Sequence, residues 1–384
     1  MTGHYVNSAG TEVTLAERWS SSKWTKLETP NPTGAKSSAL VGIACTAEEA
    51  CEAVGHYVTS GGVESTLAEV NSAKTWTVQE SPNPSGATSS GLAGVWCTSS
   101  EACTATGSYI NSSSKETLFA ERFGSTKKWA PQEPVTPKVP SGNMGRVSCT
   151  TSEACTSVGS ALNSSGVSVT LAERWNGKEW VRQETPNPTG SKGASLIAPS
   201  CATGTSCVAV GSYTNSSGIE VVMAEVWNGT TWSLKEPVTP TGAKSSKLVG
   251  ISCTSSTACI AVGTYVNSSS VEVAFSESWN GTTWSSPTEM ANPTGSKGTS
   301  ARGVSCTSST SCIATGRYIN SGGNGVALAE SWNGTAWTIQ ETSTPEGTGS
   351  WLSGVSCTSA SACIATGRSF DGDGLEVALA EEHS

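Results

Sequence analysis

Residues 247–286 read KLVGISCTSSTACIAVGTYVNSSSVEVAFSESWNGTTWSS and contain four short runs that alternate apolar and polar residues. Such a period of two is typical of strands that are buried on one face. Asn280 and Gly281 separate the last two runs, and an Asn-Gly pair tolerates the positive φ angles of a type I′ hairpin turn. We therefore predict four antiparallel strands, A to D, over residues 247–253, 259–266, 271–279 and 282–286.

A pair of cysteines with the spacing C-x5-C marks this unit and recurs along the chain. The first cysteines of successive pairs are 52, 52, 52, 52, 53 and 51 residues apart, so the chain consists of seven copies of one unit. Four strands per repeat of about 50 residues are typical of a β-propeller blade, with a solenoid as the competing architecture. We predict an all-β fold, a seven-bladed β-propeller of four-stranded antiparallel blades, in which a closed ring leaves no long exposed sheet edge.

We expect one β-propeller domain over residues 1–384, closed by joining the two ends of the chain in one blade. In that closure blade, strand A comes from the C-terminus and strand D, around Trp24, from the N-terminus, while strand C comes from residues 3–19 or 367–381. The spare hairpin is displaced or pairs with a neighbouring molecule, unless the chain was excised from a longer array. A monomer is the expectation and a strand-exchanged oligomer the alternative. The predicted blades cover approximately residues 39–90, 91–142, 143–194, 195–246, 247–299 and 300–350, with a closure blade from 351–384 plus 1–38.

The repeat resembles the kelch propeller repeat in three features. An apolar strand ends in Gly (CIAVG, 259–263), a Tyr follows two residues later, and a Trp follows a hairpin (WNGTTW, 279–284). It departs from kelch in having a single Gly and a Cys pair. It is more similar to repeats of uncharacterised secreted bacterial proteins that carry a C-x5-C pair per blade. The resemblance implies a propeller fold and no particular activity.

All fourteen cysteines belong to the repeated pairs, and a pair that faces across the A–B hairpin lies at disulfide distance. Zinc sites favour closer spacings and need two pairs together, whereas these pairs fall in different blades. Seven disulfides imply an oxidising compartment, so we expect a secreted, extracellular protein. The predicted bonds are Cys45–Cys51, Cys97–Cys103, Cys149–Cys155, Cys201–Cys207, Cys253–Cys259, Cys306–Cys312 and Cys357–Cys363.

Composition excludes several classes of partner. The net charge of −9 argues against nucleic acid and anionic membranes as partners. No apolar run approaches the roughly 18 residues that a transmembrane helix needs, so we expect no membrane insertion.

No catalytic motif is present, and only three histidines (His4, His56 and His383) could serve a triad. A glutamate that recurs in every strand C is predicted to be structural, because an active site needs asymmetry. We expect no cofactor; Asp371 and Asp373 form a weak candidate cation site or a simple turn. The recurring glutamates are Glu17, Glu69, Glu121, Glu173, Glu225, Glu277, Glu330 and Glu381.

The connections between blades and the B–C turns carry the candidate ligand-binding residues. In propellers these loops share one face, and that face commonly binds ligands. Trp351 breaks the repeat and is a candidate exposed platform for a sugar, whereas the Trp pairs of the C–D hairpins are either core or platforms. The recurring polar candidates are Lys36, Lys192, Lys244, Lys297, Asn111, Asn163, Asn215, Asn267 and Asn320, with ordinary turn chemistry as the alternative.

We interpret the chain as a secreted, non-catalytic binding module that recognises extracellular carbohydrate at several equivalent sites, like a lectin. The first alternative is a protein-interaction or structural scaffold that binds a surface protein, including an engineered or symmetrised propeller. Its specificity would come from loops that break the repeat, such as 134–146 and 343–352. A glycosidase or lyase is the third alternative.

Overall fold

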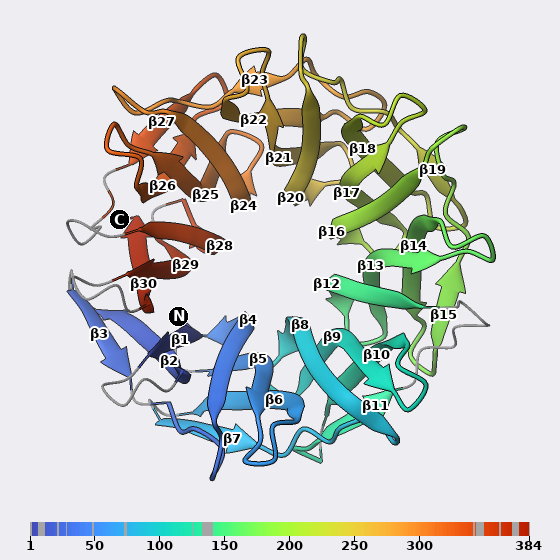
Figure 1. Cartoon of the computed structure of the whole chain (residues 1–384), viewed down its shortest axis with the longest axis vertical. Helices are drawn as coiled ribbons and strands as arrows, with labels where there is room; N and C mark the ends of the chain where they lie inside the picture. The colour runs from blue at the N-terminus through green and yellow to red at the C-terminus, as the bar shows by residue number, and fades with distance from the viewer. Residues whose placement is uncertain are drawn as a thin grey trace. The chain divides into compact units, whose positions relative to one another are not determined.

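The computed structural model is built from β-strands in two compact units, residues Met1–Thr185 and Pro186–Ser384, which we describe separately. Figure 1 labels the strands of both units. No helix among the described residues is long and apolar enough to cross a membrane. The structure describes residues 2–6, 12–20, 23–27, 29–47, 50–72, 75–124, 126–132, 141–340, 342, 349–360, 362–370 and 376–383.

The first unit contains one three-stranded sheet and three four-stranded sheets, all antiparallel. The N-terminal sheet consists of β1 (Thr2–Val6), β2 (Glu12–Ser20) and β3 (Lys23–Leu27). Sheet 1 consists of β4 (Ser37–Ala47), β5 (Ala50–Val58), β6 (Glu64–Ser72) and β7 (Thr75–Gln79). Sheet 2 consists of β8 (Ala87–Ser99), β9 (Ala102–Asn111), β10 (Glu116–Phe123) and β11 (Trp129–Gln132). Sheet 3 consists of β12 (Gly142–Thr151), β13 (Ala154–Leu162), β14 (Ser168–Trp175) and β15 (Trp180–Gln183).

The second unit repeats the pattern with three four-stranded sheets followed by one three-stranded sheet. Sheet 4 consists of β16 (Gly193–Thr203), β17 (Ser206–Thr214), β18 (Glu220–Trp227) and β19 (Trp232–Leu234). Sheet 5 consists of β20 (Ser245–Ser255), β21 (Ala258–Val266), β22 (Glu272–Trp279) and β23 (Thr288–Glu289). Sheet 6 consists of β24 (Gly298–Ser308), β25 (Ser311–Ile319), β26 (Gly325–Trp332) and β27 (Trp337–Gln340). The C-terminal sheet consists of β28 (Ser350–Ser359), β29 (Ala362–Phe370) and β30 (Glu376–His383).

The predicted A-B-C-D order is confirmed in six sheets, but the ends of the chain differ from the prediction. Strand β3, which contains Trp24, pairs with β2, and β29 pairs with β28 and β30. Of the two predicted sources of the strand C beside Trp24, residues 3–19 supply it, whereas a closure blade that combines strands from both ends is not confirmed. Each end of the chain has its own strand C, in a separate three-stranded sheet. Seven complete blades are not confirmed.

Two turns of the repeat differ from the prediction. The A–B turn is shorter, and the C–D turn has a different turn type. Ser255 pairs with Ala258, so strands A and B meet in a two-residue turn and not in a five-residue loop. In the C–D hairpin, Gly281 has a φ of 94° and is the first central residue, which is the pattern of a type II′ turn rather than type I′. Asn280 instead precedes the turn and accepts the N–H groups of residues 282 and 283 at its Oδ1. In sheet 5 the outer strand also begins later than predicted, at Thr288.

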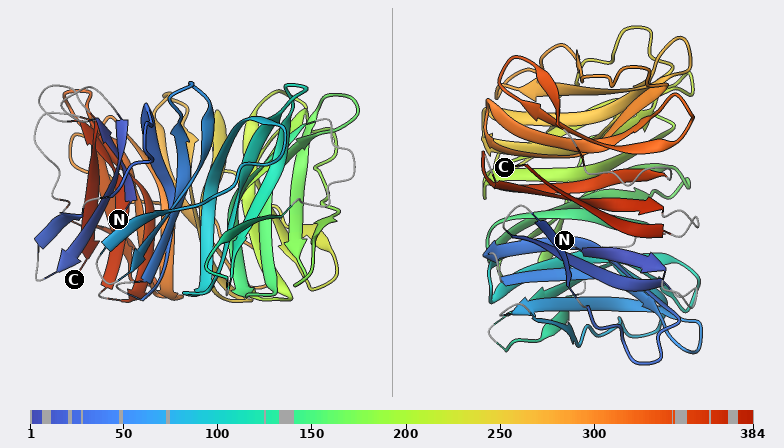
Figure 2. Two further views of the ribbon diagram at one scale, coloured as in Figure 1. Left: turned by 90° about the horizontal axis from the view of Figure 1, so that it is seen from below. Right: turned by 90° about the vertical axis from the view of Figure 1, so that its left-hand side faces the viewer.

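Within each unit, the first strands of successive sheets approach one another backbone to backbone. A Cβ atom added to Gly42 would lie 3.2 Å from the Cα of Gly94, and one added to Gly250 would lie 3.1 Å from the Arg302 carbonyl oxygen. A bulge at this point in strand A, such as the one between Leu248 and Gly250, accompanies the close approach. In Figure 2, strands of neighbouring sheets within each unit run side by side, with their turns gathered at two ends.

The described tryptophans of the C–D hairpins form core and not exposed platforms, apart from Trp332, which is half-buried. Trp279 and Trp284 are buried with their rings 5.5 Å apart, and the Trp175–Trp180 rings are 6.0 Å apart. The Trp284 indole N–H donates to the Lys235 carbonyl of the preceding sheet at 2.9 Å. These pairs therefore fill the space between sheets and join neighbouring sheets. The side chains of Trp19 and Trp24 lie outside the described residues.

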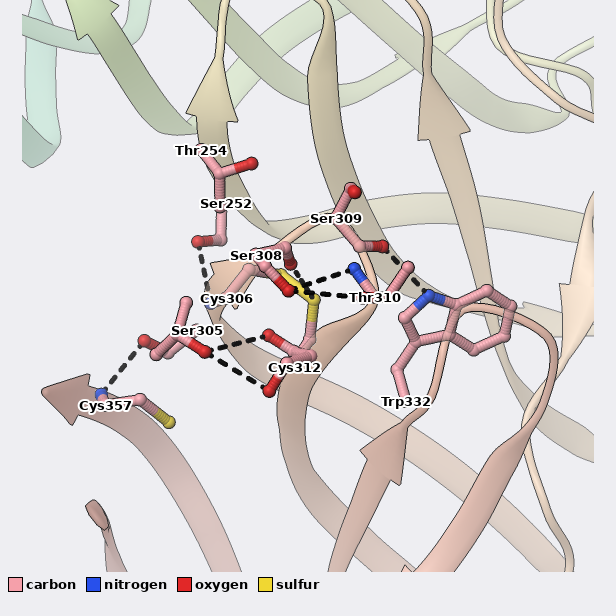
Figure 3. The surroundings of a disulfide bond; sticks show 12 residues. Ser252, Thr254, Ser305, Cys306, Ser308, Ser309, Thr310, Cys312, Trp332 and Cys357 are labelled. Atoms are coloured by element: carbon pink, nitrogen blue, oxygen red, sulfur yellow. Dashed lines mark hydrogen bonds between the residues drawn. A yellow bond between two sulfur atoms is a disulfide. The ribbon is translucent and has the colours of Figure 1, made fainter. Parts of the chain in front are cut away.

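All seven predicted disulfides are present, each between residues that lie directly opposite on strands A and B. The serine that precedes the first cysteine links neighbouring sheets at the same level (Figure 3). The Cys306 N–H donates to Ser252 Oγ at 3.0 Å, and the Cys357 N–H donates to Ser305 Oγ at 3.0 Å. Hydrogen bonds thus connect the first strands between sheets, while covalent bonds stay within each sheet.

Candidate functional site

The connections between sheets place a lysine at one end of strand A. In the segment Pro240–Ala243, the Ala243 N–H donates to the Pro240 carbonyl at 3.1 Å, and Gly242 has a φ of 73°. This is the geometry of a type II turn, which requires a positive φ at its third residue. The turn places Lys244 directly before β20. The same turn precedes Lys36, Lys192 and Lys297.

Each of these lysines lies beside the B–C turn of its own sheet. The backbone N–H of Lys244 donates to the Val266 carbonyl at 2.7 Å, and its Nζ donates to Ser270 Oγ at 2.7 Å. The predicted lysine and turn residues are therefore brought together, and we call this region the lysine–asparagine end of the sheets. The other backbone bonds run from Lys36 to Val58, Lys192 to Thr214 and Lys297 to Ile319 at 2.7–2.8 Å.

The predicted asparagines close the B–C turns. Asn267 Oδ1 accepts the N–H of Ser269 at 2.9 Å and that of Val271 at 3.1 Å. Ordinary turn chemistry thus occupies this oxygen, as expected of an Asn at the start of a turn. Ligand binding by these asparagines stays a prediction. A ligand would be bound by the side-chain amide nitrogen, because the oxygen is used in the turn. The equivalent bonds are made by Asn111, Asn163, Asn215 and Asn320.

Of the remaining sequence candidates, only Trp351 belongs to the part of the chain that the structure describes. Trp351 is half-buried and lies within β28, opposite Arg368, rather than in the connection before it. Asp371 and Asp373 lie outside the described residues. The described part of the chain contains no group of three or more His, Cys, Asp or Glu side chains close enough to hold a metal ion.

Sequence reasoning missed a buried hydroxyl at the start of strand A. Thr299 Oγ1 accepts the Ala274 N–H of the preceding sheet at 3.0 Å and donates to Asn292 Oδ1 at 3.1 Å. Ser350 accepts the Ala327 N–H in the same way at 2.9 Å. The recurring Ser or Thr after each connection was a visible signal for this bond between sheets.

The recurring glutamates of strand C are buried in sheets 1 to 6, and Glu277 and Glu330 bind the chain that leaves the preceding sheet. Glu277 Oε2 accepts the Val238 N–H at 2.8 Å, and Glu330 Oε2 accepts the Ala291 N–H at 2.7 Å. Burial raises the pKa of Glu277 to about 8 and that of Glu330 to about 7, although the backbone hydrogen bonds oppose the shift. Their position between sheets supports the predicted structural role.

Two apolar side chains on neighbouring first strands are exposed, and one of them departs from the repeat. Trp96 is 44% exposed and occupies the position that Ser252 holds in sheet 5. Val41, on the adjacent strand β4, is 57% exposed. Scattered exposed apolar residues are common, but an exposed Trp at a serine position is particular to sheet 2.

Comparison with solved structures identifies this arrangement of sheets. A YCF48 protein bound to a D1 peptide is 12% identical, with a TM-score of 0.51, over 91% of this chain and 94% of that chain. YCF48 from Cyanidioschyzon merolae is 16% identical, with a TM-score of 0.50, over 91% and 97%. The chain has a β-propeller fold. Sheets 1 to 6 are accordingly its four-stranded blades.

A more distant propeller is the fucose-specific lectin from Aleuria aurantia, which is 14% identical with a TM-score of 0.44, over 80% of this chain and 96% of that chain. No protein-family model and no curated protein matches the sequence. The kelch resemblance is therefore not confirmed, whereas the β-propeller architecture is.

Proposed function

We propose that this propeller is a secreted, non-catalytic module that binds extracellular carbohydrate at the lysine–asparagine end of its blades. The observation that carries the proposal is the recurrence of one exposed arrangement. Lys36, Lys192, Lys244 and Lys297 are all exposed, and each lies beside a B–C turn that is rich in hydroxyl and amide groups. Equivalent polar surfaces on several blades suit a repetitive ligand such as a polysaccharide.

Multiple weak sites gain avidity when one ligand spans them. Linked binding events raise overall affinity by a factor of about 10² or more without any new contact. A lysine donates hydrogen bonds to sugar hydroxyls, and an asparagine amide can donate further ones. Because the four lysines are in equivalent positions, the proposal predicts additive loss of avidity rather than a single essential residue.

Secretion is proposed from the covalent structure. Disulfides persist in oxidising compartments and are reduced in the cytosol of most organisms. All fourteen cysteines are paired, and no free cysteine is present. The proposal therefore places the protein outside the cell.

A glycan array that includes bacterial cell-wall polysaccharides, probed with the oxidised and labelled protein, tests the proposal. We expect a chemically related set of hits. Replacing the four lysines with Ala one after another should lower avidity in steps, with thermal unfolding unchanged. Silence of the wild-type protein across the array would overturn carbohydrate binding.

A protein-binding role is the second candidate, favoured by exposed Trp96 and Val41 on neighbouring first strands. Tryptophan is among the residues most enriched at the energetic centres of protein interfaces. Under this alternative, a Trp96→Ser variant would lose its extracellular protein partner and the lysine variants would keep it. The loops 134–146 and 343–352, which we also predicted to give specificity, lie largely outside the described residues.

A further inference from the structure

Sheet 6 carries a group of polar side chains that differs from the serine–glutamate pairs of sheets 2 and 4. Arg317 in β25 lies directly opposite Ser300 in β24, so both side chains are on the same face of sheet 6. Arg317 Nη2 is 4.0 Å from Glu272 Oε2, which belongs to sheet 5. The three residues therefore meet where sheets 5 and 6 adjoin, at the lysine–asparagine end. Arg317 is one-third exposed and Glu272 about half exposed.

The corresponding glutamates of other blades already have hydrogen-bond donors. Ser108 donates to Glu116 at 2.8 Å, and Ser212 donates to Glu220 at 2.7 Å, each within one blade. Glu64 accepts a bond from Ser89 at 2.9 Å. In these blades a serine hydroxyl already donates a hydrogen bond to the first glutamate of strand C.

Sheet 6 lacks this glutamate. Gly325 takes its position, and a Cβ atom there would lie 3.9 Å from Arg317 Cδ. Arg317 consequently has no carboxylate at this position in its own blade and extends toward Glu272 of the preceding blade. At 4.0 Å the two groups attract each other but do not form a hydrogen bond.

Two polar atoms of this group have no partner among the described residues. They are Arg317 Nε and Ser300 Oγ, and both atoms are buried. Buried polar atoms in folded proteins are nearly always satisfied by the protein or by ordered water, so these two atoms mark a place beside the half-exposed Glu272 where a water or a ligand hydroxyl completes the group. The cluster offers guanidinium donors, a carboxylate acceptor and a hydroxyl that can do either.

We propose that Glu272, Ser300 and Arg317 form a binding site for a neutral sugar through two adjacent hydroxyl groups. Arg317 donates to hydroxyl oxygens, and Glu272 accepts a sugar O–H. A sugar hydroxyl, which both donates and accepts, matches this mixed set of groups. The carboxylate of Glu272 disfavours uronic acids and sialic acids, because a second carboxylate would be repelled. This inference rests on the proposed carbohydrate-binding function and adds one asymmetric site to the repeated ones.

The test uses the oxidised full-length chain, a glycan array, and isothermal titration with methyl glycosides of galactose, glucose, mannose, fucose and N-acetylglucosamine. We expect wild-type protein to bind at least one neutral glycoside. Arg317→Ala and Glu272→Ala should each weaken that binding by tenfold or more, and Ser300→Ala by several-fold. Arg317→Lys should recover binding only in part, because a lysine lacks the planar fork.

Ser212→Ala, at the equivalent strand B position of sheet 4, is the matched control and should bind like wild type. Thermal unfolding of each variant separates loss of the site from loss of the fold. If wild type binds neutral glycosides and Arg317→Ala binds them equally well, the site is wrong and the proposed function stands. Preference for acidic sugars would overturn the assigned ligand class. If wild type binds no glycan at all, the proposed function and this inference both fail.

Discussion

The Glu277 carboxyl accepts the backbone N–H of Val238 at 2.8 Å, across the boundary between two successive blades. This carboxyl, of a type that serves as a catalytic acid in other proteins, therefore has a structural contact here. It binds the connection that leaves one blade and so attaches that connection to strand C of the next blade. Its side chain is 1% exposed, and burial raises its pKa to about 8. The same contact recurs at Glu330.

This buried carboxyl should make stability depend on pH. A carboxyl whose pKa is 4.5 when unfolded and about 8 when folded binds more protons in the folded state. Stability is therefore highest below pH 4.5 for this group and falls as the pH rises toward 8, by roughly 3–4 kcal/mol between pH 5 and pH 8. Glu277→Gln keeps the acceptor oxygen and should flatten this dependence. Thermal unfolding from pH 5 to 9 measures it, with exposed Glu179→Gln as the control; parallel curves for Glu277→Gln and wild type would contradict the prediction.

The serine bonds between first strands should contribute to stability one by one. Ser252→Ala leaves the Cys306 N–H without its acceptor, which costs about 1–3 kcal/mol when the group is buried. Denaturant unfolding of the oxidised protein measures the loss. Ser256→Ala, in the exposed A–B turn of the same blade, should change stability by less than about 0.5 kcal/mol. Equal effects of the two substitutions would show that the bond is not stabilising.

The glycine of strand B has no room for a side chain. A Cβ atom on Gly263 would overlap the carbonyl oxygen of Lys247 on the neighbouring strand A. Gly263→Ala should therefore destabilise the blade by about 3 kcal/mol or more, because backbone cannot move aside cheaply. Gly124→Ala, where no atom lies within 4 Å of the added Cβ, is the control. Circular dichroism during thermal unfolding would report both, and an unchanged midpoint for Gly263→Ala would contradict the packing described.

Removal of one disulfide should be tolerated. Replacing Cys253 and Cys259 together with Ser opens a loop of a few residues, and the chain-entropy model assigns such a loop about 2–3 kcal/mol. We expect a folded variant with a lowered unfolding midpoint. Thiol labelling of the unfolded, unreduced wild type should find no reactive cysteine; detection of free thiols would contradict the pairing.

The sequence was sufficient for the repeat, the strand order and the cysteine pairing, because the repeat shows as a regular spacing of 51–53 residues and the other two depend on patterns within one repeat. The period-two runs and the C-x5-C pairs predicted β20 to β22 and the Cys253–Cys259 bond directly. The Asn280-Gly281 pair predicted a hairpin between strands C and D. It did not show which two residues are the central residues of the turn. That choice depends on Asn280 Oδ1 capping the turn.

The candidate site could be predicted only in part. Recurrence pointed to the lysines and to the B–C turns, and the structure brings the two together. The Glu272–Arg317 pair lies 45 residues apart in sequence and on different blades, so no local pattern reveals it. The pairing at the two ends was left open, because copies of strand C exist at both ends and sequence alone does not say which pairs with Trp24.

Each disulfide links a cysteine to the next cysteine along the chain, six residues away. During synthesis, the partner of every first cysteine emerges before any other cysteine does. Oxidation in the order of emergence therefore yields the native pairing out of the very large number of pairings that fourteen cysteines allow. Loss or duplication of a whole repeat would also leave every remaining pair intact. The chain can thus fold oxidatively without correction of mispaired bonds, and its repeat number can change without any new cysteine having to find a partner.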